Sequence, residues 1–439
     1  MRPLQHLTFE ALRDLLRAQC RQVPDARDPQ RITWPLHDVL MSGFAMFFFQ
    51  HPSLLQFQQT MEEQTGQSNL QRMFGVSRVP SDTQMRALLD TPEAAEPLRR
   101  VLPLVFERMR QTGWTTRFTT MINGVNYYTV VLDGSQYFSS EKVQCHSCLQ
   151  RKDKNGDVHD AHNVVAATLV RAGSHDILPL DAEEVRNCDG RAKQDCEIKA
   201  GKRLIQRLRQ EHPQLKMIVA GDDWYAHEPF IWDLRALRMS FVLVAKPESH
   251  QELYEWGEDL DRLGQCVKGT WEEGPLAKRR YFEYRIASQV PLTQSDQVHV
   301  NFVEVWERNK NGQVIYHNAW VTDFDVSADN VATIVGIGRS RWKIENAQFN
   351  VQKNHGYELE HNYGHGQNGL SLVFYLLNLL AFLAHEVLQQ GDRLYLVCRA
   401  RESRRSLWNA FRTYFRRLVC TSWTALLKFH LHLEPVPDT

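Results

Sequence analysis

Residues 127–134 read Tyr-Tyr-Thr-Val-Val-Leu-Asp-Gly, a run of aromatic and β-branched residues that closes with an Asp-Gly pair. Such residues favour a strand and Asp-Gly is typical of a turn, so we expect a short buried strand that ends at Asp133. Residues 217–222, Met-Ile-Val-Ala-Gly-Asp, repeat the pattern and predict a second strand that ends at Asp222. Two apolar strands that each end in an aspartate therefore define the centre of the predicted fold.

The segments around these two strands alternate between strand and helix patterns. Residues 163–170 and 176–180 flank a Gly-Ser turn and predict two further strands, and residues 193–210 have the periodicity of a surface helix. Residues 217–245 then read strand, helix, strand, which implies parallel pairing through right-handed crossovers. The sequence therefore predicts the α/β class with a mixed sheet.

Helical patterns flank this α/β region on both sides. Residues 7–112 are helical in pattern, with a capping box expected at Ser81 and Gln84. Residues 252–325 are β-rich, with a hairpin at Asn-Lys-Asn-Gly (309–312). A helix over 340–353 returns the chain to the core. The expected regions are a helical N-terminal domain (1–120), the first part of the core (121–250), a β-rich insertion (251–326), the second part of the core (327–390) and a basic helical C-terminal region (391–439).

Composition narrows the class of protein. A chain of 439 residues with 43% hydrophobic residues can bury a core of two or three structural units. The apolar stretches 39–49 and 370–388 are too short for a bilayer or are interrupted by Asn378 and His385, so we expect buried helices and no membrane span. The N-terminus lacks the pattern of a signal peptide, which favours the cytoplasm. Because the formal net charge is zero, contact with nucleic acid would depend on local basic surfaces.

A third carboxylate, Glu345, lies in the predicted helix Arg-Trp-Lys-Ile-Glu-Asn-Ala-Gln-Phe (341–349), where Trp342, Ile344 and Phe349 are expected to face the core. Carboxylates that converge from rigid elements can hold two divalent metal ions about 4 Å apart, as phosphodiester cleavage requires. A single aspartate at a strand end is more often a turn or cap residue. The prediction therefore depends on the combined order of strand-Asp, hairpin strands, helix, strand-Asp, helix, strand, β-insert and helix-Glu.

The second aspartate has a competitor, because Asp223 directly follows Asp222. We favour Asp222, which ends the strand and keeps an Asp-x-x-Tyr spacing to Tyr225. Beside it, Trp224 either stacks on an unpaired base at a DNA end or, as is more common, packs as a structural aromatic.

The element order and local sequences resemble the DDE transposases of bacterial insertion sequences, and among these the hairpin-forming family with a β-rich insert before the glutamate. The resemblance covers about residues 130–366. Its motifs are Val-Leu-Asp-Gly (131–134), Val-Ala-Gly-Asp-Asp-Trp-Tyr (219–225) and Arg-Trp-Lys-Ile-Glu followed by Phe-Asn-Val-Gln-Lys (341–353).

The resemblance implies an RNase H-like mixed-sheet core in which Asp133, Asp222 and Glu345 are the catalytic residues and bind two Mg²⁺ or Mn²⁺ ions. It further implies a DNA transposase that binds the terminal inverted repeats of its mobile element, cleaves DNA through a hairpin intermediate and joins it to target DNA as a homodimer. Two positions depart from the family pattern, since Gly338 and Gln352 stand where a tyrosine and a lysine are usual.

The helical N-terminal domain (1–120) is expected to bind DNA, and several side chains elsewhere are expected to contact it. By the resemblance, Arg341 faces a phosphate, Lys353 replaces the usual lysine one residue out of register, and His361 lies in the segment just downstream of the glutamate. The segment 391–420 carries eight arginines and a local net charge of +6. Its Trp408, Phe411 and Phe415 share one helical face, so arginines around that face either contact phosphates or form a solvated surface. The candidates for phosphate contact are Arg404, Arg405 and Arg412.

Cys145-His-Ser-Cys148 has the spacing of half a zinc site. His162 together with Cys188 or Cys196 would complete a tetrahedral set, and we take Cys145, Cys148, His162 and Cys196 as the predicted ligands of a structural Zn²⁺. Reduced thiols near a turn are the alternative.

Two other functions fit the same sequence. An RNase H-like endonuclease would cut without strand transfer, and a domesticated, inactive descendant would act as a DNA-binding regulator. Carboxylates at all three predicted positions favour an active enzyme.

Overall fold

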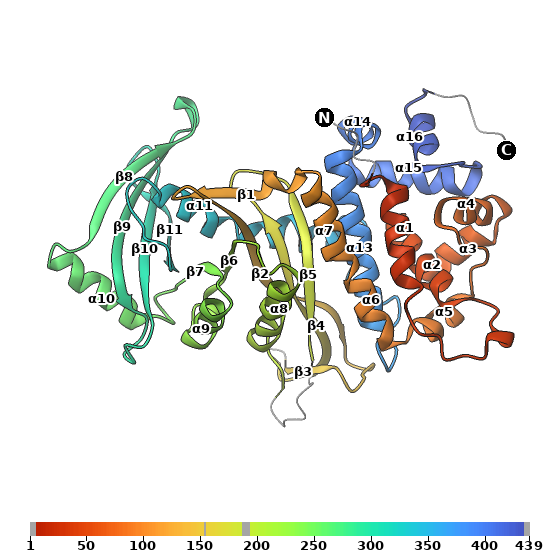
Figure 1. The fold of residues 1–439 in the computed structure, drawn as a ribbon, viewed down its shortest axis with the longest axis horizontal. Helices are drawn as coiled ribbons and strands as arrows, with labels where there is room; N and C mark the ends of the chain where they lie inside the picture. The colour runs from red at the N-terminus through yellow and green to blue at the C-terminus, as the bar shows by residue number, and fades with distance from the viewer. Residues whose placement is uncertain (1–5, 153–154, 187–193, 434–439) are drawn as a thin grey trace.

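The computed structural model describes residues 6–152, 155–186 and 194–433, and its fold is organised around one mixed sheet of eleven strands (Figure 1). The order along the sheet is β3-β4-β2-β6-β7-β11-β10-β9-β8, with β1 beside β2 and β5 beside β4. The strands are β1 (Thr119–Ile122), β2 (Val125–Ser140), β3 (Leu149–Lys152), β4 (Val158–Val170), β5 (Ile177–Val185), β6 (Met217–Gly221), β7 (Ser240–Val244), β8 (Val267–Glu273), β9 (Arg280–Pro291), β10 (His299–Arg308) and β11 (Val314–Thr322).

The centre of the sheet has the predicted parallel pairing. Strand β2 pairs with β6 up to Val131 and Ala220, and β6 pairs in parallel with β7. The connections run through α8 (Glu197–Glu211) and α9 (Glu228–Ala236), which Figure 1 shows in front of the sheet. On the other side of β2, strands β4 and β5 add antiparallel pairs. The α/β class and the mixed sheet are confirmed.

Strand β2 is longer than the Asp-Gly signal predicted. Asp133 does not end it, because antiparallel pairing with β4 continues from Asp133↔Ala166 to Ser140↔Asp160. The parallel pairing with β6, in contrast, stops at Val131. Beyond Asp133, therefore, β2 stays hydrogen-bonded to β4 but is no longer paired with β6.

The β-rich region does not form a separate sheet. Its predicted hairpin pairs β10 with β11, and β11 pairs with β7, so the insertion extends the central sheet. The first twelve residues of this region are a helix, α10 (Gln251–Arg262), where strands were expected. The helix is amphipathic, with Leu253 buried and the Tyr254 ring 5.0 Å from that of Phe302 on β10, so packing on the extended sheet explains the difference.

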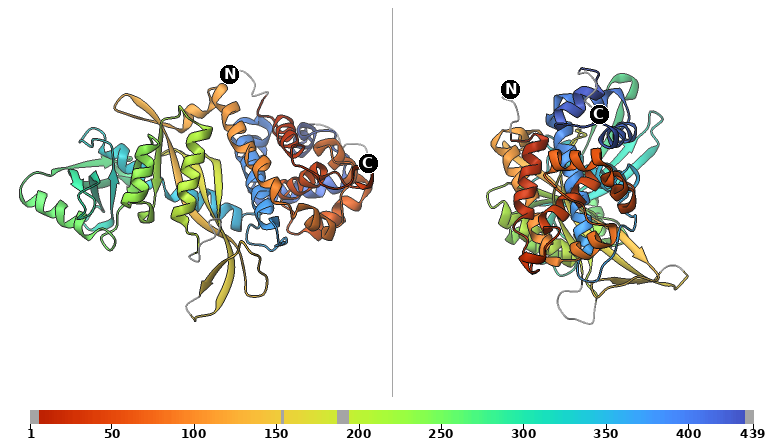
Figure 2. Two further views of the ribbon diagram at one scale, coloured as in Figure 1. Left: turned by 60° about the horizontal axis from the view of Figure 1, so that its bottom comes forward. Right: turned by 90° about the vertical axis from the view of Figure 1, so that its right-hand side faces the viewer.

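The N-terminal and C-terminal helices form one helical unit at the other end of the elongated molecule (Figures 1 and 2). Its helices are α1 (Phe9–Cys20), α2 (Leu36–Phe48), α3 (Leu54–Glu62), α4 (Gln64–Phe74), α5 (Asp82–Leu89), α6 (Ala95–Arg99), α7 (Val101–Gln111), α13 (Leu370–Gly391), α14 (Arg393–Arg401), α15 (Arg404–Arg417) and α16 (Trp423–His430). The capping box of Ser81 and Gln84 is present at the start of α5. Asn69 on α4 donates to the carbonyls of Phe415 and Leu418, so the tail is packed onto the N-terminal helices.

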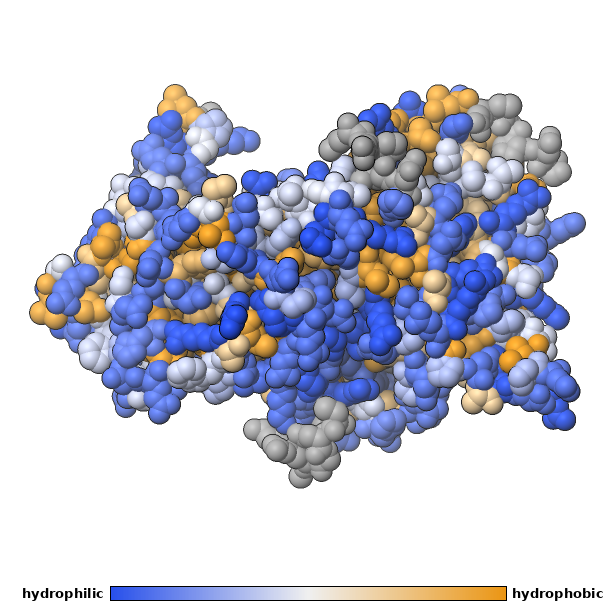
Figure 3. Space-filling view, in the orientation of Figure 1, coloured by the Kyte–Doolittle hydropathy of each residue, from blue (hydrophilic) through white to orange (hydrophobic). Residues whose placement is uncertain are grey.

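Helix α13 is the core of this unit and contacts α2, α6 and strand β5. Among the described residues it alone is long and apolar enough to cross a membrane, yet nearly all of it is buried within the fold, as expected of a core helix. The surface seen in Figure 3 is largely hydrophilic, with scattered apolar patches.

Candidate functional site

Asp133 and Asp222 lie at the same level of neighbouring strands. Each lies two residues beyond the last pair between β2 and β6, which is Val131 with Ala220. Side chains two residues apart along a strand share a face, so the shared register brings the two carboxylates together at the point where the parallel strands separate. The sequence prediction that adjacent strands present two aspartates at one place is met by this geometry.

Asp223 is held in a different network. Its carboxylate accepts a hydrogen bond of 2.7 Å from the backbone N–H of Lys246 and another from the Ser249 hydroxyl, and it lies 3.4 Å from Nε2 of His250. Although burial opposes it, hydrogen bonding by His250 and Ser249 lowers the pKa of Asp223 to about 2. Asp223 therefore anchors the segment after β7, and Asp222 is the aspartate that faces Asp133.

Glu345 approaches Asp133 from a turn that packs against β2. It lies in a π-helical turn, η6 (Ile344–Phe349), between α11 (Val331–Arg339) and α12 (Asn350–Asn354). The helix predicted over 340–353 is present from residue 342 to Asn354, after a turn at 340–341, and it contains this π-helical segment, a feature common at functional sites. Helix α11 is a further helix that the sequence did not predict. The turn is fixed by buried Ile344 and Phe349, as predicted, and by the fully buried Gln348.

The Gln348 side chain is the hydrogen-bonded anchor of this turn. Thr168 on β4 donates a hydrogen bond of 2.5 Å to its Oε1. Trp342 was expected in the core but is 56% exposed, because the π-bulge and the turn at residue 340 change which side chains face the sheet.

Arg341 lies among the carboxylates. Its Nη1 is 2.5 Å from Oε1 of Glu345 and 3.7 Å from Oδ2 of Asp133. The guanidinium therefore neutralises part of the negative charge of Glu345 and Asp133.

Glu197 is a fourth carboxylate at this site, and the sequence did not single it out. It stands in the first turn of α8, where an acidic residue is ordinary. A Cβ at Gly134, the residue after Asp133, would lie 2.4 Å from the Glu197 carboxylate carbon, so Gly134 provides the space for it. Burial and the charge of Asp222 raise the pKa of Glu197.

The electrostatics of the site indicate a surplus of negative charge. Burial, opposed by Arg341 and reinforced by the charges of Glu345 and Asp222, raises the pKa of Asp133 to about 7. Burial likewise raises the pKa of Asp222 against the effect of Arg341. Arg341, Lys246 and Arg151 offset only part of the charge of the four carboxylates, and such an all-oxygen set is what Mg²⁺ and Mn²⁺ prefer.

A groove opens beside Asp222. It is lined by Arg151 on β3, Glu197 and Ile198 on α8, and the indole of Trp224. Trp224 is 69% exposed, so the expectation that it packs inside the protein is wrong, and the indole is available to stack on a ligand.

Two other predicted DNA contacts lie in the segment downstream of Glu345. Lys353 forms an ion pair of 2.8 Å with Glu360. His361 is exposed and its ring contacts Tyr363. Neither side chain has an interaction with the carboxylate site in the structure.

The C-terminal arginines divide into internal and surface groups. Arg404 pairs with Glu386 at 3.0 Å and donates to the Tyr357 hydroxyl, and Arg412 donates to the carbonyls of Phe49 and Gln50. These two arginines stabilise the helical unit, which corrects their assignment as phosphate contacts. Arg405 is exposed. The predicted apolar face of Trp408, Phe411 and Phe415 is buried.

The two departures from the family pattern have structural reasons. A Cβ at Gly338 would lie 2.3 Å from Nε1 of Trp320, so Trp320 fills the space that a side chain would need. Gln352 is fully buried and donates to Oδ1 of Asn378 on α13. Gly338 and Gln352 are therefore both packed in the core.

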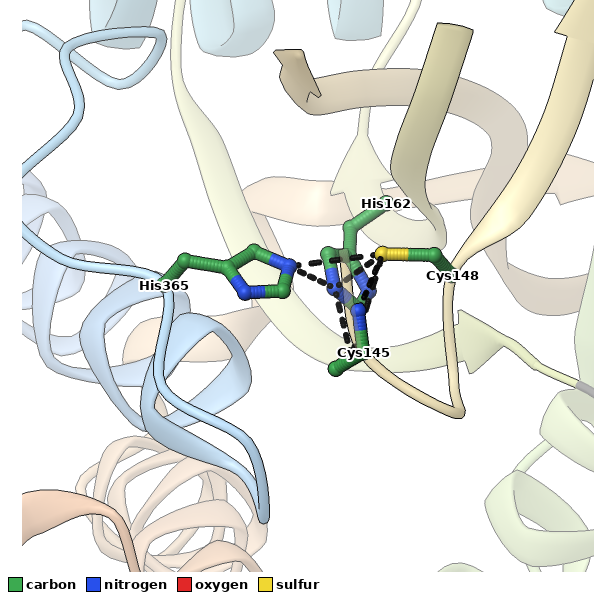
Figure 4. A group of neighbouring side chains, drawn as sticks. All are labelled: Cys145, Cys148, His162 and His365. Atoms are coloured by element: carbon green, nitrogen blue, oxygen red, sulfur yellow. Dashed lines mark hydrogen bonds between the residues drawn. The ribbon is translucent and has the colours of Figure 1, made fainter. Parts of the chain in front are cut away.

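A second cluster of side chains could hold a metal ion. It consists of Cys145, Cys148, His162 and His365, and their ligand atoms all lie within 4.8 Å of one another (Figure 4). Three of these were predicted from the sequence. The prediction that Cys196 is the fourth ligand is wrong. Cys196 is the exposed residue before α8 and is not in the cluster. Cys188 lies outside the described residues. His365, which takes the fourth place, is 217 residues from Cys148, so spacing gave no signal for it.

No family model matches the sequence, and a search of curated proteins finds no match either.

Proposed function

We propose that this chain is a DDE transposase with an RNase H-like core, which binds the double-stranded ends of a mobile element, cleaves them and joins them to target DNA. The observation that carries the proposal is the convergence of Asp133, Asp222 and Glu345 from two parallel strands and a π-helical turn. The order of elements supports it, because the chain runs strand-Asp, hairpin strands, helix, strand-Asp, helix, strand, β-insert and helix-Glu.

The residues of the site fit a pair of divalent cations. All candidate ligand atoms are carboxylate oxygens, and Glu197 adds one more carboxylate to the predicted three. When bound, two Mg²⁺ or Mn²⁺ ions would activate the attacking hydroxyl and stabilise the leaving oxygen. Arg341, which contacts both Asp133 and Glu345, would then be displaced toward the negative charge of the substrate phosphate.

The groove next to the carboxylates suits a nucleic-acid strand. Trp224 offers an exposed aromatic face beside Asp222, and Arg151 adds a positive charge to the lining of the groove. Stacking of a base on an indole tolerates any sequence, which suits a strand end that must be held apart from its partner. We assign the groove to the DNA strand nearest the scissile phosphate.

The test uses a supercoiled plasmid that carries the coding sequence with its natural flanking DNA as the donor, and a second plasmid as the target. With Mg²⁺ and the purified chain, a transposase excises the segment and joins it to the target. Cleavage without joined product would instead identify an endonuclease. Binding without cleavage would identify an inactive DNA-binding descendant, and either result overturns the proposal.

A further inference from the structure

We infer that Cys145, Cys148, His162 and His365 form a closed Zn²⁺ site that fastens the loop between β2 and β3 to the segment between α12 and α13. This site is separate from the carboxylate site and does not depend on the proposed function. Its ligands come from three places: the two cysteines from one loop, His162 from β4, and His365 from the segment that follows the Glu345 helix (Figure 4).

The distances between the ligand atoms match a zinc tetrahedron. Zinc bonds of about 2.3 Å to sulfur and about 2.05 Å to nitrogen give tetrahedral edges of about 3.8 Å between sulfurs, 3.6 Å between sulfur and nitrogen, and 3.3 Å between nitrogens. The two Sγ atoms are 3.8 Å apart. Sγ–Nε2 distances are 3.5 Å and 3.4 Å from Cys145 and Cys148 to His162, and 3.3 Å from Cys148 to His365. The two Nε2 atoms are 3.1 Å apart.

Both histidines are oriented as metal ligands usually are. Each turns Nε2 into the cluster. Nδ1 of His365 is hydrogen-bonded to the Gly366 carbonyl at 2.8 Å, and Nδ1 of His162 lies at an ion-pair distance of 3.2 Å from Oε1 of Glu184. Such partners fix the tautomer and ring orientation of zinc-bound histidine. Glu184 is itself held by the Tyr137 hydroxyl at 3.1 Å.

The environment favours a structural zinc. Cys148, His162 and His365 are buried, and four protein ligands fill a tetrahedral ion. Cysteine binds a metal as the thiolate, and a divalent cation would stabilise both thiolates of the cluster together.

The segment joined by the zinc has a second anchor nearby. The Asp90 carboxylate accepts hydrogen bonds from the backbone N–H groups of residues 367–370, at the start of α13. His365 therefore enters the cluster from a segment that is fixed on its C-terminal side. The zinc would fix the same segment at His365, and this would connect the helical unit to the edge of the central sheet.

The test measures zinc in the full chain, purified under reducing conditions without chelator, by mass spectrometry. We expect about one zinc per chain, and less than about a fifth of that in Cys145→Ser and His365→Gln. Matched controls are Cys196→Ser and His361→Gln, which replace an exposed cysteine and an exposed histidine outside the cluster, and both should keep the full amount.

If the cluster variants do not fold, the wild-type chain still decides the matter. Replacement of its zinc by Co²⁺ should give the visible absorption of tetrahedral cobalt with thiolate ligands. Absence of both zinc and that spectrum would overturn the inference. Full zinc retention by folded His365→Gln, or loss of zinc in Cys196→Ser, would overturn the ligand set.

Discussion

Asp133 and Asp222 occupy the same register level of two parallel strands, each two residues past the last pair between β2 and β6. On one side Asp133 remains paired to β4, and on the other side the sheet opens. At this level β4 still provides hydrogen-bond partners for the backbone of β2, while side chains of β2 and β6 can reach a ligand. The position of the site therefore follows from the pairing pattern.

The first prediction separates Asp222 from its neighbour. Asp222→Ala should abolish Mg²⁺-dependent DNA cleavage and leave the melting temperature nearly unchanged, because its carboxylate has few structural partners. Asp223→Ala should lower the unfolding free energy by about 1–3 kcal/mol, since the Lys246 N–H and the Ser249 hydroxyl lose their acceptor. Thermal unfolding and cleavage are measured on both variants. Reversed effects would show that Asp223 is the ligand.

The second prediction concerns Glu197. If it helps to hold the cations, Glu197→Gln should raise the Mg²⁺ concentration needed for half-maximal cleavage by about tenfold, within the range for groups that support a metal site. Gly134→Ala should act in the same direction, because the new Cβ would displace the Glu197 carboxylate. Glu211→Gln, at the exposed far end of α8, is the control. An unchanged Mg²⁺ titration for Glu197→Gln would exclude it from the site.

The third prediction contrasts two adjacent arginines. Arg404→Ala should destabilise the chain by about 3 kcal/mol, because it leaves the largely buried Glu386 without its partner. Arg405→Ala should leave stability within about 0.5 kcal/mol, as is usual for surface positions. DNA affinity measured at several salt concentrations should fall only for Arg405→Ala. Equal stabilities of the two variants would contradict the internal role of Arg404.

The fourth prediction is a pH dependence of stability. Burial, with a smaller contribution from Arg412, lowers the pKa of His51 to about 3. The unfolded chain therefore binds this proton at higher pH than the folded chain does, so the unfolding free energy falls as the pH drops below about 6.5. Protonation of His51 in the unfolded chain lowers the unfolding free energy by about 2 kcal/mol between pH 6.5 and pH 5.

Chemical denaturation of His51→Asn across that range should show a shallower fall than the wild type. His175→Asn, at an exposed position, should keep the wild-type slope. Parallel curves for the wild type and His51→Asn would contradict the assignment.

The sequence predicted the centre of the fold well because its signals there are local. The strand, helix and strand predicted over residues 217–245 are present in that order as β6, α9 and β7. The end of β2 was mispredicted, since Asp-Gly is a turn signal only where no neighbour continues the pairing. The end of β2 is set instead by β4, a partner strand about thirty residues further along the chain.

The candidate sites show the same limit. The three carboxylates were found because each ends or interrupts an apolar pattern, whereas Glu197 looks like any acidic residue in a first helical turn. His365 was missed as a ligand because the tertiary fold alone brings it to the cysteines. Trp224 was expected to pack, but the turn after β6 leaves its indole outside.

The central claim is that the carboxylates at the open edge of β2 and β6 carry out metal-dependent DNA cleavage, and the rate of that cleavage tests it most directly. The rate is measured with Mg²⁺ on the flanked donor plasmid for the wild type and for Asp133→Asn, Asp222→Asn and Glu345→Gln. Each variant should bind the plasmid normally and cleave it at least about a thousandfold more slowly, equivalent to about 4 kcal/mol in the barrier. A folded variant that cleaves within tenfold of the wild type would contradict the claim.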